Sequence, residues 1–196
     1  MIAYHGSTVQ GLSVLKPFAN PVSNLDYAAV YLTTYKPLAA IYIWNKPYKW
    51  MNYGFDNDGL PIYTESFPNA LKEFYLGVSG AIYTCDSDFE YDPNAKIKIS
   101  VVSKNDVAVN DVDIIQDCYS RICEYADQGL LHINYYDTLT EQKRESEHRM
   151  ILSAIKYHKL LQGSHPMAPF VKEKFPDIWE EAKKNENKLD NQTACP

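Results

Sequence analysis

Short apolar blocks separated by turn-forming residues run through the first third of the chain. Ile2–Tyr4 and Ala29–Thr33 combine β-branched and aromatic residues over a few positions, which predicts short buried strands. Pro37 suits the first turn of a helix, where its missing N–H needs no partner, so we expect a helix from there to about Trp44. Residues 45–62 mix Pro, Gly, Asn and Asp with aromatic residues and predict an ordered loop.

The middle of the chain alternates between strand-like and helix-like patterns. A short helix is expected over Asn69–Leu76, because Gly77 follows as a stop signal. Gly80–Cys85 and Ile97–Val102 read as strands. Apolar residues recur at helical spacing over Asp113–Asp127 and predict a helix there.

The last third of the chain is predicted to be mainly helical. The tetrapeptide from Thr138 to Glu141 fits a capping box and opens the longest expected helix, with Gly163 as its stop. A further charged helix follows Pro176. Short strands with segregated helices indicate an α+β fold. We expect a single domain over residues 1–196, with a cleft-forming α/β part in residues 1–112 and a helical extension in residues 113–196.

Composition narrows the class of protein. The chain has 196 residues, 45% of them hydrophobic, which suffices for one domain with a sizeable core. A formal charge of −6 and a pI near 5.3 argue against general nucleic-acid binding, which needs a basic surface. The sequence starts without signal-peptide features and lacks an apolar run approaching the roughly 20 residues of a membrane span. We therefore expect a cytoplasmic protein without membrane contact.

No metal site is predicted. The four cysteines are scattered without a Cys-x-x-Cys pair, at Cys85, Cys118, Cys123 and Cys195. The acidic stretch from Asp86 to Asp92 lacks the glycine and glutamate that a calcium-binding loop requires at its sixth and twelfth positions.

The most informative pattern joins three sites near the start of the chain. Tyr4-His5-Gly6-Ser7 places an imidazole beside a glycine, whose bare backbone a ligand can approach closely. Tyr31 lies in the next predicted strand, and Tyr42 follows eleven positions later in the predicted helix. This set of groups suits a flat, polar aromatic ring attached to a sugar.

On these residues the chain resembles the ADP-ribosyltransferase superfamily, in its diphtheria-toxin-like and poly(ADP-ribose) polymerase-like branch. The resemblance implies split antiparallel β-sheets around an NAD cleft, with NAD as substrate and release of nicotinamide. It also implies that His5 and Tyr31 are catalytic residues that orient the ribose, with His5 donating to a ribose hydroxyl. Gly6 would hold the carboxamide beside Ser7, and Tyr42 would stack on the nicotinamide.

Two positions depart from that family's pattern. Ser100 occupies the place of a strand glutamate that grips the ribose, and Ala39 replaces a serine three residues before the stacking tyrosine. Glu65 and Glu90 are candidates to supply a carboxylate from elsewhere, and Glu65 is the catalytic candidate of the two. Transfer of a single ADP-ribose unit to an unknown protein or small-molecule acceptor is expected rather than polymerisation, because the glutamate that helps elongation is absent.

Three other readings stay open at this point. The chain fits a catalytically degenerate member of the family that binds a nucleotide or a protein partner. It also fits a plain interaction domain, if the spacing of the two tyrosines is chance. RNA 2′-phosphate transfer needs cationic groups, and the acidic chain holds only three arginines, Arg121, Arg144 and Arg149.

Overall fold

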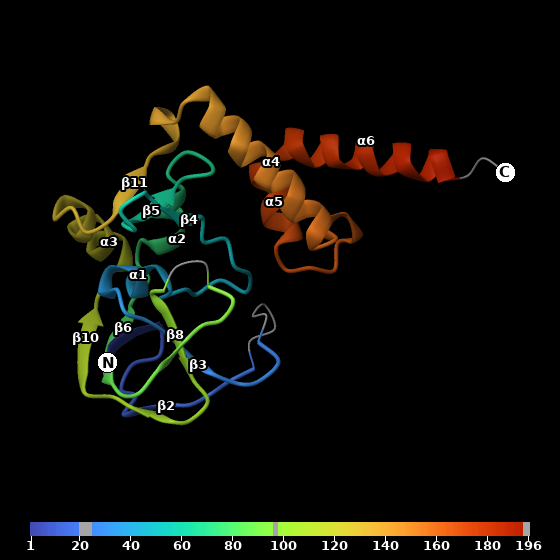
Figure 1. The fold of residues 1–196 in the computed structure, drawn as a ribbon. Helices are drawn as coiled ribbons and strands as arrows, with labels where there is room; N and C mark the ends of the chain where they lie inside the picture. The colour runs from blue at the N-terminus through green and yellow to red at the C-terminus, as the bar shows by residue number, and fades with distance from the viewer. Residues whose placement is uncertain (20–24, 96–97, 194–196) are drawn as a thin grey trace. The chain divides into compact units, whose positions relative to one another are not determined.

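The computed structural model describes residues 1–19, 25–95 and 98–193, and it divides into two compact units (Figure 1). The first unit comprises residues 1–45, 51–64 and 69–133, and the second comprises residues 46–50, 65–68 and 134–196. The described residues contain several antiparallel sheets and six α-helices, three of them in the C-terminal part. The predicted α+β class and the C-terminal helices are confirmed, whereas the single-domain assignment stays a prediction.

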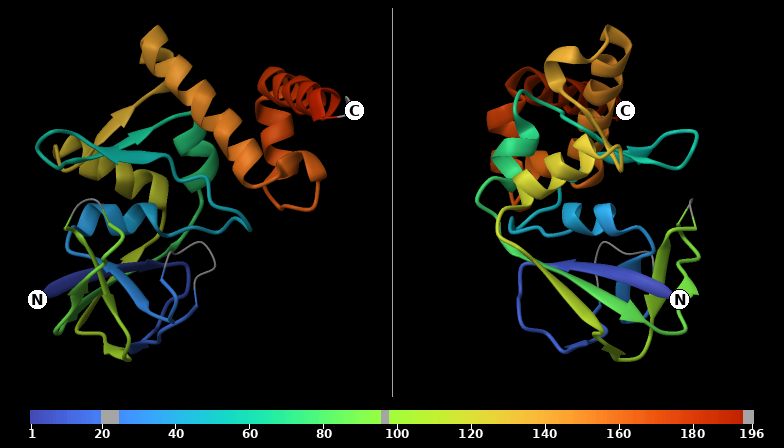
Figure 2. Two further views of the ribbon diagram at one scale, coloured as in Figure 1. Left: turned by 45° about the vertical axis from the view of Figure 1, so that its right-hand side comes forward. Right: turned by 90° about the vertical axis from the view of Figure 1, so that its left-hand side faces the viewer.

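A six-stranded antiparallel sheet forms the base of the first unit (Figure 2). Its strands lie in the order β10 (Asp111–Ile115), β6 (Gly80–Asp86), β1 (Ile2–Ser7), β3 (Val30–Thr33), β8 (Ser100–Ser103) and β7 (Glu90–Tyr91). The strands carrying His5, Tyr31 and Ser100 are therefore consecutive neighbours in the sheet, although these residues are far apart in the sequence.

The pairing of β1 differs on its two sides. Toward β6 it is continuous, from Ile2 opposite Asp86 to Ser7 opposite Ala81. Toward β3, in the described residues, the register is the pair of Tyr4 with Thr33. The segment of β1 that holds the histidine–glycine motif is therefore paired along its length with β6, whereas its described pairing with β3 stops at Tyr4.

The two faces of this sheet are covered differently. One face carries a core cluster of buried apolar side chains, which includes Ala3, Val30, Leu32, Tyr83 and Val101. Because side chains alternate along a strand, the residues between them point to the opposite face. Helix α1 (Lys36–Ile41) lies along that opposite face (Figure 2).

The remaining elements of the first unit are two small sheets and two helices. The sheets contain β11 (His132–Asn134), β5 (Pro61–Thr64) and β4 (Tyr53–Phe55) in one, and β2 (Val14–Leu15) and β9 (Val107–Ala108) in the other. The helices are α2 (Ala70–Tyr75) and α3 (Cys118–Asp127).

Several predictions for the first unit are wrong in detail. The expected loop over residues 45–62 holds β4 and the start of β5, which pair with one another through Tyr53 and Tyr63. The expected helix over Asp113–Asp127 begins only at Cys118, because the preceding residues pair with β6 as β10. Strand β1 extends beyond Tyr4 to Ser7. Strand β8 starts at Ser100, and Ile97, the predicted start, lies outside the described residues.

The second unit consists of helices around an aromatic core. Its elements are η1 (Tyr136–Thr138), α4 (Glu141–Tyr157), η2 (Leu160–Gln162), α5 (Ala168–Lys174) and α6 (Pro176–Thr193). Trp50 lies edge-on to Phe170 and stacks with Phe175, at ring-centroid distances of 5.2 and 5.6 Å. Phe67 packs against both phenylalanines at 5.9 Å. Trp50, Phe67, Phe170 and Phe175 are all buried, so these rings form the core of this unit.

The longest predicted helix exists, but its ends differ from those expected. Thr140 caps the N-terminus of α4 by accepting from the N–H of Lys143, two residues after the predicted cap at Thr138. The helix ends at Tyr157, with His158 as its C-cap. Gly163, the predicted stop, instead ends η2 with a φ of 77°.

Candidate functional site

The imidazole of His5 joins β1 to β3 through the backbone of Tyr31. The distance from His5 Nδ1 to the carbonyl oxygen of Tyr31 is 2.8 Å. A carbonyl oxygen only accepts, so Nδ1 carries the proton and Nε2 keeps a lone pair in the neutral ring. Burial lowers the pKa of His5, and the hydrogen bond to Tyr31 opposes this effect only in part. The imidazole is therefore neutral at pH 7, with Nε2 as an acceptor.

Gly6 lies directly against the backbone of α1. A Cβ at this position would come within 1.9 Å of the carbonyl oxygen of Ala39 and 3.2 Å of Ile43 Cγ1. Only glycine allows the helix to approach the strand so closely. The missing side chain thus has a packing role, whatever its backbone does toward a ligand.

The side chain of Tyr31 ends in a buried polar atom. Its hydroxyl is buried and has no hydrogen-bond partner among the residues that the structure describes. Its ring packs edge-on against Phe18, with centroids 5.3 Å apart and planes at 60°. Buried hydroxyls are almost always paired in folded proteins, so this phenol has capacity for a further polar group.

Tyr42 lies at the C-cap of α1, with its amide hydrogen-bonded to the carbonyl groups of Ala39 and Ala40. Its hydroxyl is hydrogen-bonded to the hydroxyl of Tyr53, and the two rings meet edge-on at 5.8 Å and 74°. Burial, and after it the neighbouring Tyr53, raises the pKa of Tyr42 far above its ordinary value, so the phenol stays protonated.

The sequence did not single out Tyr53, because residues 45–62 read as a loop. The signal was nevertheless present. Tyr53-Gly54-Phe55 and Pro61–Thr64 are short aromatic and β-branched runs, separated by Asp, Asn and Gly residues that favour a hairpin turn. Reading the two runs together would have placed Tyr53 on a strand.

Sheet register shows how the predicted residues lie on the first unit. Thr33 pairs with Tyr4 on one side and with Ser100 on the other, so these three side chains share a face. By alternation Gly6 and Tyr31 lie on the same face, which is the face that α1 covers.

His5 and Ser7 alternate to the other face, where Tyr83 is the cross-strand neighbour of His5. The hydroxyl of Ser7 accepts from the N–H of Val9 at 3.1 Å. The sequence-predicted residues of the first unit are thus gathered on three adjacent strands and one helix, but on both faces of the sheet.

Glu65 belongs to the second unit and has a local structural role there. Its side chain is buried, with 4% of its surface exposed. Its Oε2 accepts from the N–H of Tyr136 at 3.1 Å, and its own N–H donates to the carbonyl of Asn134 at 3.0 Å. The buried carboxylate of Glu65 is therefore hydrogen-bonded to the backbone at the start of η1.

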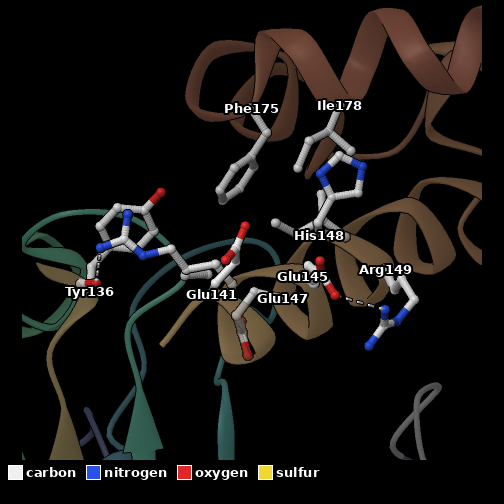
Figure 3. Close-up of a pocket in the computed structure, with 11 residues that line it drawn as sticks. Tyr136, Glu141, Glu145, Glu147, His148, Arg149, Phe175 and Ile178 are labelled. Carbon is white, nitrogen blue, oxygen red and sulfur yellow. Dashed lines mark hydrogen bonds and ion pairs between the residues drawn. The ribbon is translucent and has the colours of Figure 1, made fainter. Parts of the chain in front are cut away.

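A separate pocket of about 500 Å³ lies within the second unit (Figure 3). Phe175 and Ile178 extend toward Glu141 and His148 in this view. His148 Nε2 lies 2.8 Å from Oε2 of Glu181, which joins α4 to α6.

The cationic groups of this pocket are already engaged within the unit. Arg149 lies 3.8 Å from Glu145. Arg144 donates to the carbonyl groups of Tyr136 and Asp137 and covers the ring of Tyr136 at 5.0 Å. Both arginines of the pocket therefore have partners within the second unit.

Comparisons with known proteins identify no relative: no protein-family model, no curated protein and no solved structure matches this chain. Residues 1–19, 25–95 and 98–193 hold no group of three or more His, Cys, Asp or Glu side chains that could bind a metal ion. Cys195 lies outside these residues. No helix in the same ranges is long and apolar enough to cross a membrane.

Proposed function

We propose that the first unit binds NAD and transfers a single ADP-ribose unit to an acceptor, with release of nicotinamide. The proposed fold is of the ADP-ribosyltransferase type, with the NAD cleft where β1 and β3 part beyond the pair of Tyr4 with Thr33. We also propose that the protein acts in the cytoplasm.

The observation that carries the proposal is the buried hydroxyl of Tyr31, which lacks a partner among the described residues. Leaving such a group unpaired costs about 1–3 kcal/mol, and a hydroxyl of a bound ribose would supply the missing hydrogen bond. The imidazole of His5, which is hydrogen-bonded to the backbone carbonyl of Tyr31, supplies a second polar group between β1 and β3.

The neutral imidazole refines the role expected of His5. Because Nδ1–H donates to the carbonyl of Tyr31, Nε2 accepts from a ribose hydroxyl at neutral pH instead of donating to it. Gly6 presents its backbone to the carboxamide, and Tyr42 stacks on the nicotinamide ring. A stacked aromatic pair contributes about 0.5–1.5 kcal/mol beyond its burial.

In the reaction, the bond between the nicotinamide nitrogen and C1′ of the ribose breaks, and its electron pair stays with nicotinamide. A nucleophilic atom of the acceptor bonds to C1′ and releases its proton. The intermediate sugar has cationic character, as in glycoside hydrolysis, so a carboxylate near it accelerates the reaction.

A second candidate function is ligand binding without turnover. It is favoured by Ser100, which pairs with Thr33. Ser100 has a hydroxyl at the position where the ADP-ribosyltransferases that the chain resembles have a carboxylate. Loss of one such electrostatic contact typically costs about 3 kcal/mol of transition-state stabilisation. The carboxylate of Glu65 is already hydrogen-bonded to the backbone of Tyr136, so its catalytic role stays a prediction.

Calorimetric titration of the full chain with NAD tests the proposal, together with chromatographic detection of free nicotinamide. We expect binding by the wild type and its loss in His5→Ala and Tyr42→Ala. Tyr157→Ala is the matched control, because this side chain is 81% exposed and lies in the second unit. Binding without nicotinamide release, even with a cell extract as the source of acceptors, would select the second candidate. No binding at millimolar NAD would refute the transferase proposal and leave a protein partner as the ligand of the second candidate.

A further inference from the structure

We propose that Tyr53 is a positioning residue for the nicotinamide ring, because its hydroxyl and its ring hold Tyr42 in one orientation. The inference rests on the proposed function, in which Tyr42 stacks on nicotinamide. It adds the β4–β5 hairpin to a site otherwise built from β1, β3 and α1.

The two contacts between these tyrosines restrain different motions. The hydroxyl of Tyr42 lies on the axis about which its ring turns, so its hydrogen bond to Tyr53 fixes where the end of the side chain lies. This bond leaves rotation of the ring plane free. The edge-on contact at 5.8 Å and 74° then selects the plane of the ring. Together they define the surface that a stacked ligand would meet.

Tyr42 needs such support because of its place in the chain. It is the C-cap of a six-residue helix, so no further helical turn packs beside it. The last turn of a helix is where the backbone frays. Nearby, the hydroxyl of Tyr75 donates to the carbonyl of Ile41 at 2.8 Å and holds the backbone at the same end.

Tyr53 is itself held on a defined strand. It pairs with Tyr63 in the β4–β5 register, and Tyr63 is buried with 1% of its surface exposed. The ring of Tyr53 also packs edge-on against Phe55, with centroids 5.9 Å apart. A side chain anchored in this way can restrain Tyr42 without ordering cost when the ligand arrives.

The experiment compares NAD with ADP-ribose, which lacks the nicotinamide ring. Calorimetry is done on the full chain as wild type, Tyr42→Phe, Tyr53→Phe and the double variant, with Tyr157→Phe as control. Each single variant loses the shared hydrogen bond, so we expect NAD affinity to fall about three- to tenfold and ADP-ribose affinity to stay unchanged. The double variant should match the single ones, since all three lack the same bond.

The outcomes separate this inference from the proposed function. Wild-type affinity for NAD in Tyr53→Phe, with binding lost in Tyr42→Ala, overturns the inference and leaves the function standing. Equal losses for NAD and ADP-ribose would assign Tyr53 a general structural role and also overturn it. A wild type that binds neither ligand overturns both. Thermal unfolding, monitored by circular dichroism, verifies that each variant is folded.

Discussion

The hydroxyl of Tyr83, in the middle of β6, donates to the carbonyl oxygen of Val9 at 2.8 Å. The phenol oxygen of Tyr83 in turn accepts from the N–H of Leu12 at 3.2 Å, so one phenol serves two backbone groups of the segment that follows the histidine–glycine motif. The side chain of Tyr83 is fully buried. This residue therefore connects the core of the first unit to the chain leaving β1.

Tyr83→Phe removes both of these hydrogen bonds without changing the shape of the ring. We expect the free energy of unfolding to fall by about 1–3 kcal/mol, because the backbone groups of Val9 and Leu12 lose their partner. Urea denaturation measures this change. Tyr157→Phe, at an exposed position, should stay within about 0.5 kcal/mol of wild type. Equal stability of the two variants would show that water replaces the phenol at no cost.

Gly6→Ala should be among the most damaging single substitutions in the first unit. The added methyl group would lie 1.9 Å from the carbonyl oxygen of Ala39, which is backbone and cannot rotate away. We expect a loss of about 1–3 kcal/mol, or failure to fold. Gly54→Ala is the control, because a Cβ there meets nothing within 4 Å. The measurement is thermal unfolding, and similar midpoints for the two variants would contradict the close contact of β1 with α1.

The stability of the protein should depend on the protonation of His5. Burial lowers the pKa of His5 below its ordinary value of 6.5, so the unfolded chain takes up the proton at a higher pH than the folded chain. Stability is therefore fully present above pH 6.5, and it falls as the pH drops from there through the folded pKa. Urea denaturation between pH 5 and pH 8 measures the slope.

His5→Gln should reduce this slope, because the amide cannot titrate. His158, whose pKa is lowered by burial and by His165, contributes in the same direction in every variant and does not obscure the difference. His132→Gln is the matched control at an exposed position. A slope unchanged in His5→Gln would mean that the imidazole titrates alike in the folded and unfolded chains.

Thr140→Ala should weaken the start of α4 in the second unit. The hydroxyl of Thr140 accepts from the N–H of Lys143, and loss of such a cap costs about 0.5–2 kcal/mol. Hydrogen exchange of the first-turn amides should accelerate. Thr140→Ser keeps the oxygen and should restore protection. If Thr138→Ala had the larger effect, the cap would lie at the position that the sequence pattern indicated.

The sequence by itself determined the elements that local pattern defines. The apolar run around Tyr31 became β3, Pro37 lies in the first turn of α1, and the residues after Pro176 form α6. It also determined which residues deserve testing, because the order and spacing of His5, Gly6, Tyr31 and Tyr42 are visible without coordinates. Each of these features depends on residues close together in the chain.

Tertiary structure alone decided what depends on partners distant in the chain. Asp111–Ile115 is a strand because β6 offers it a pairing edge, although helical spacing continues from there into α3. The fit of Gly6 against Ala39 and the bond between Tyr42 and Tyr53 join separate elements. Glu65 is assigned to the second unit by its own contacts. Hydrophobic periodicity reports which side of an element is buried, but it carries no information about which neighbour covers that side.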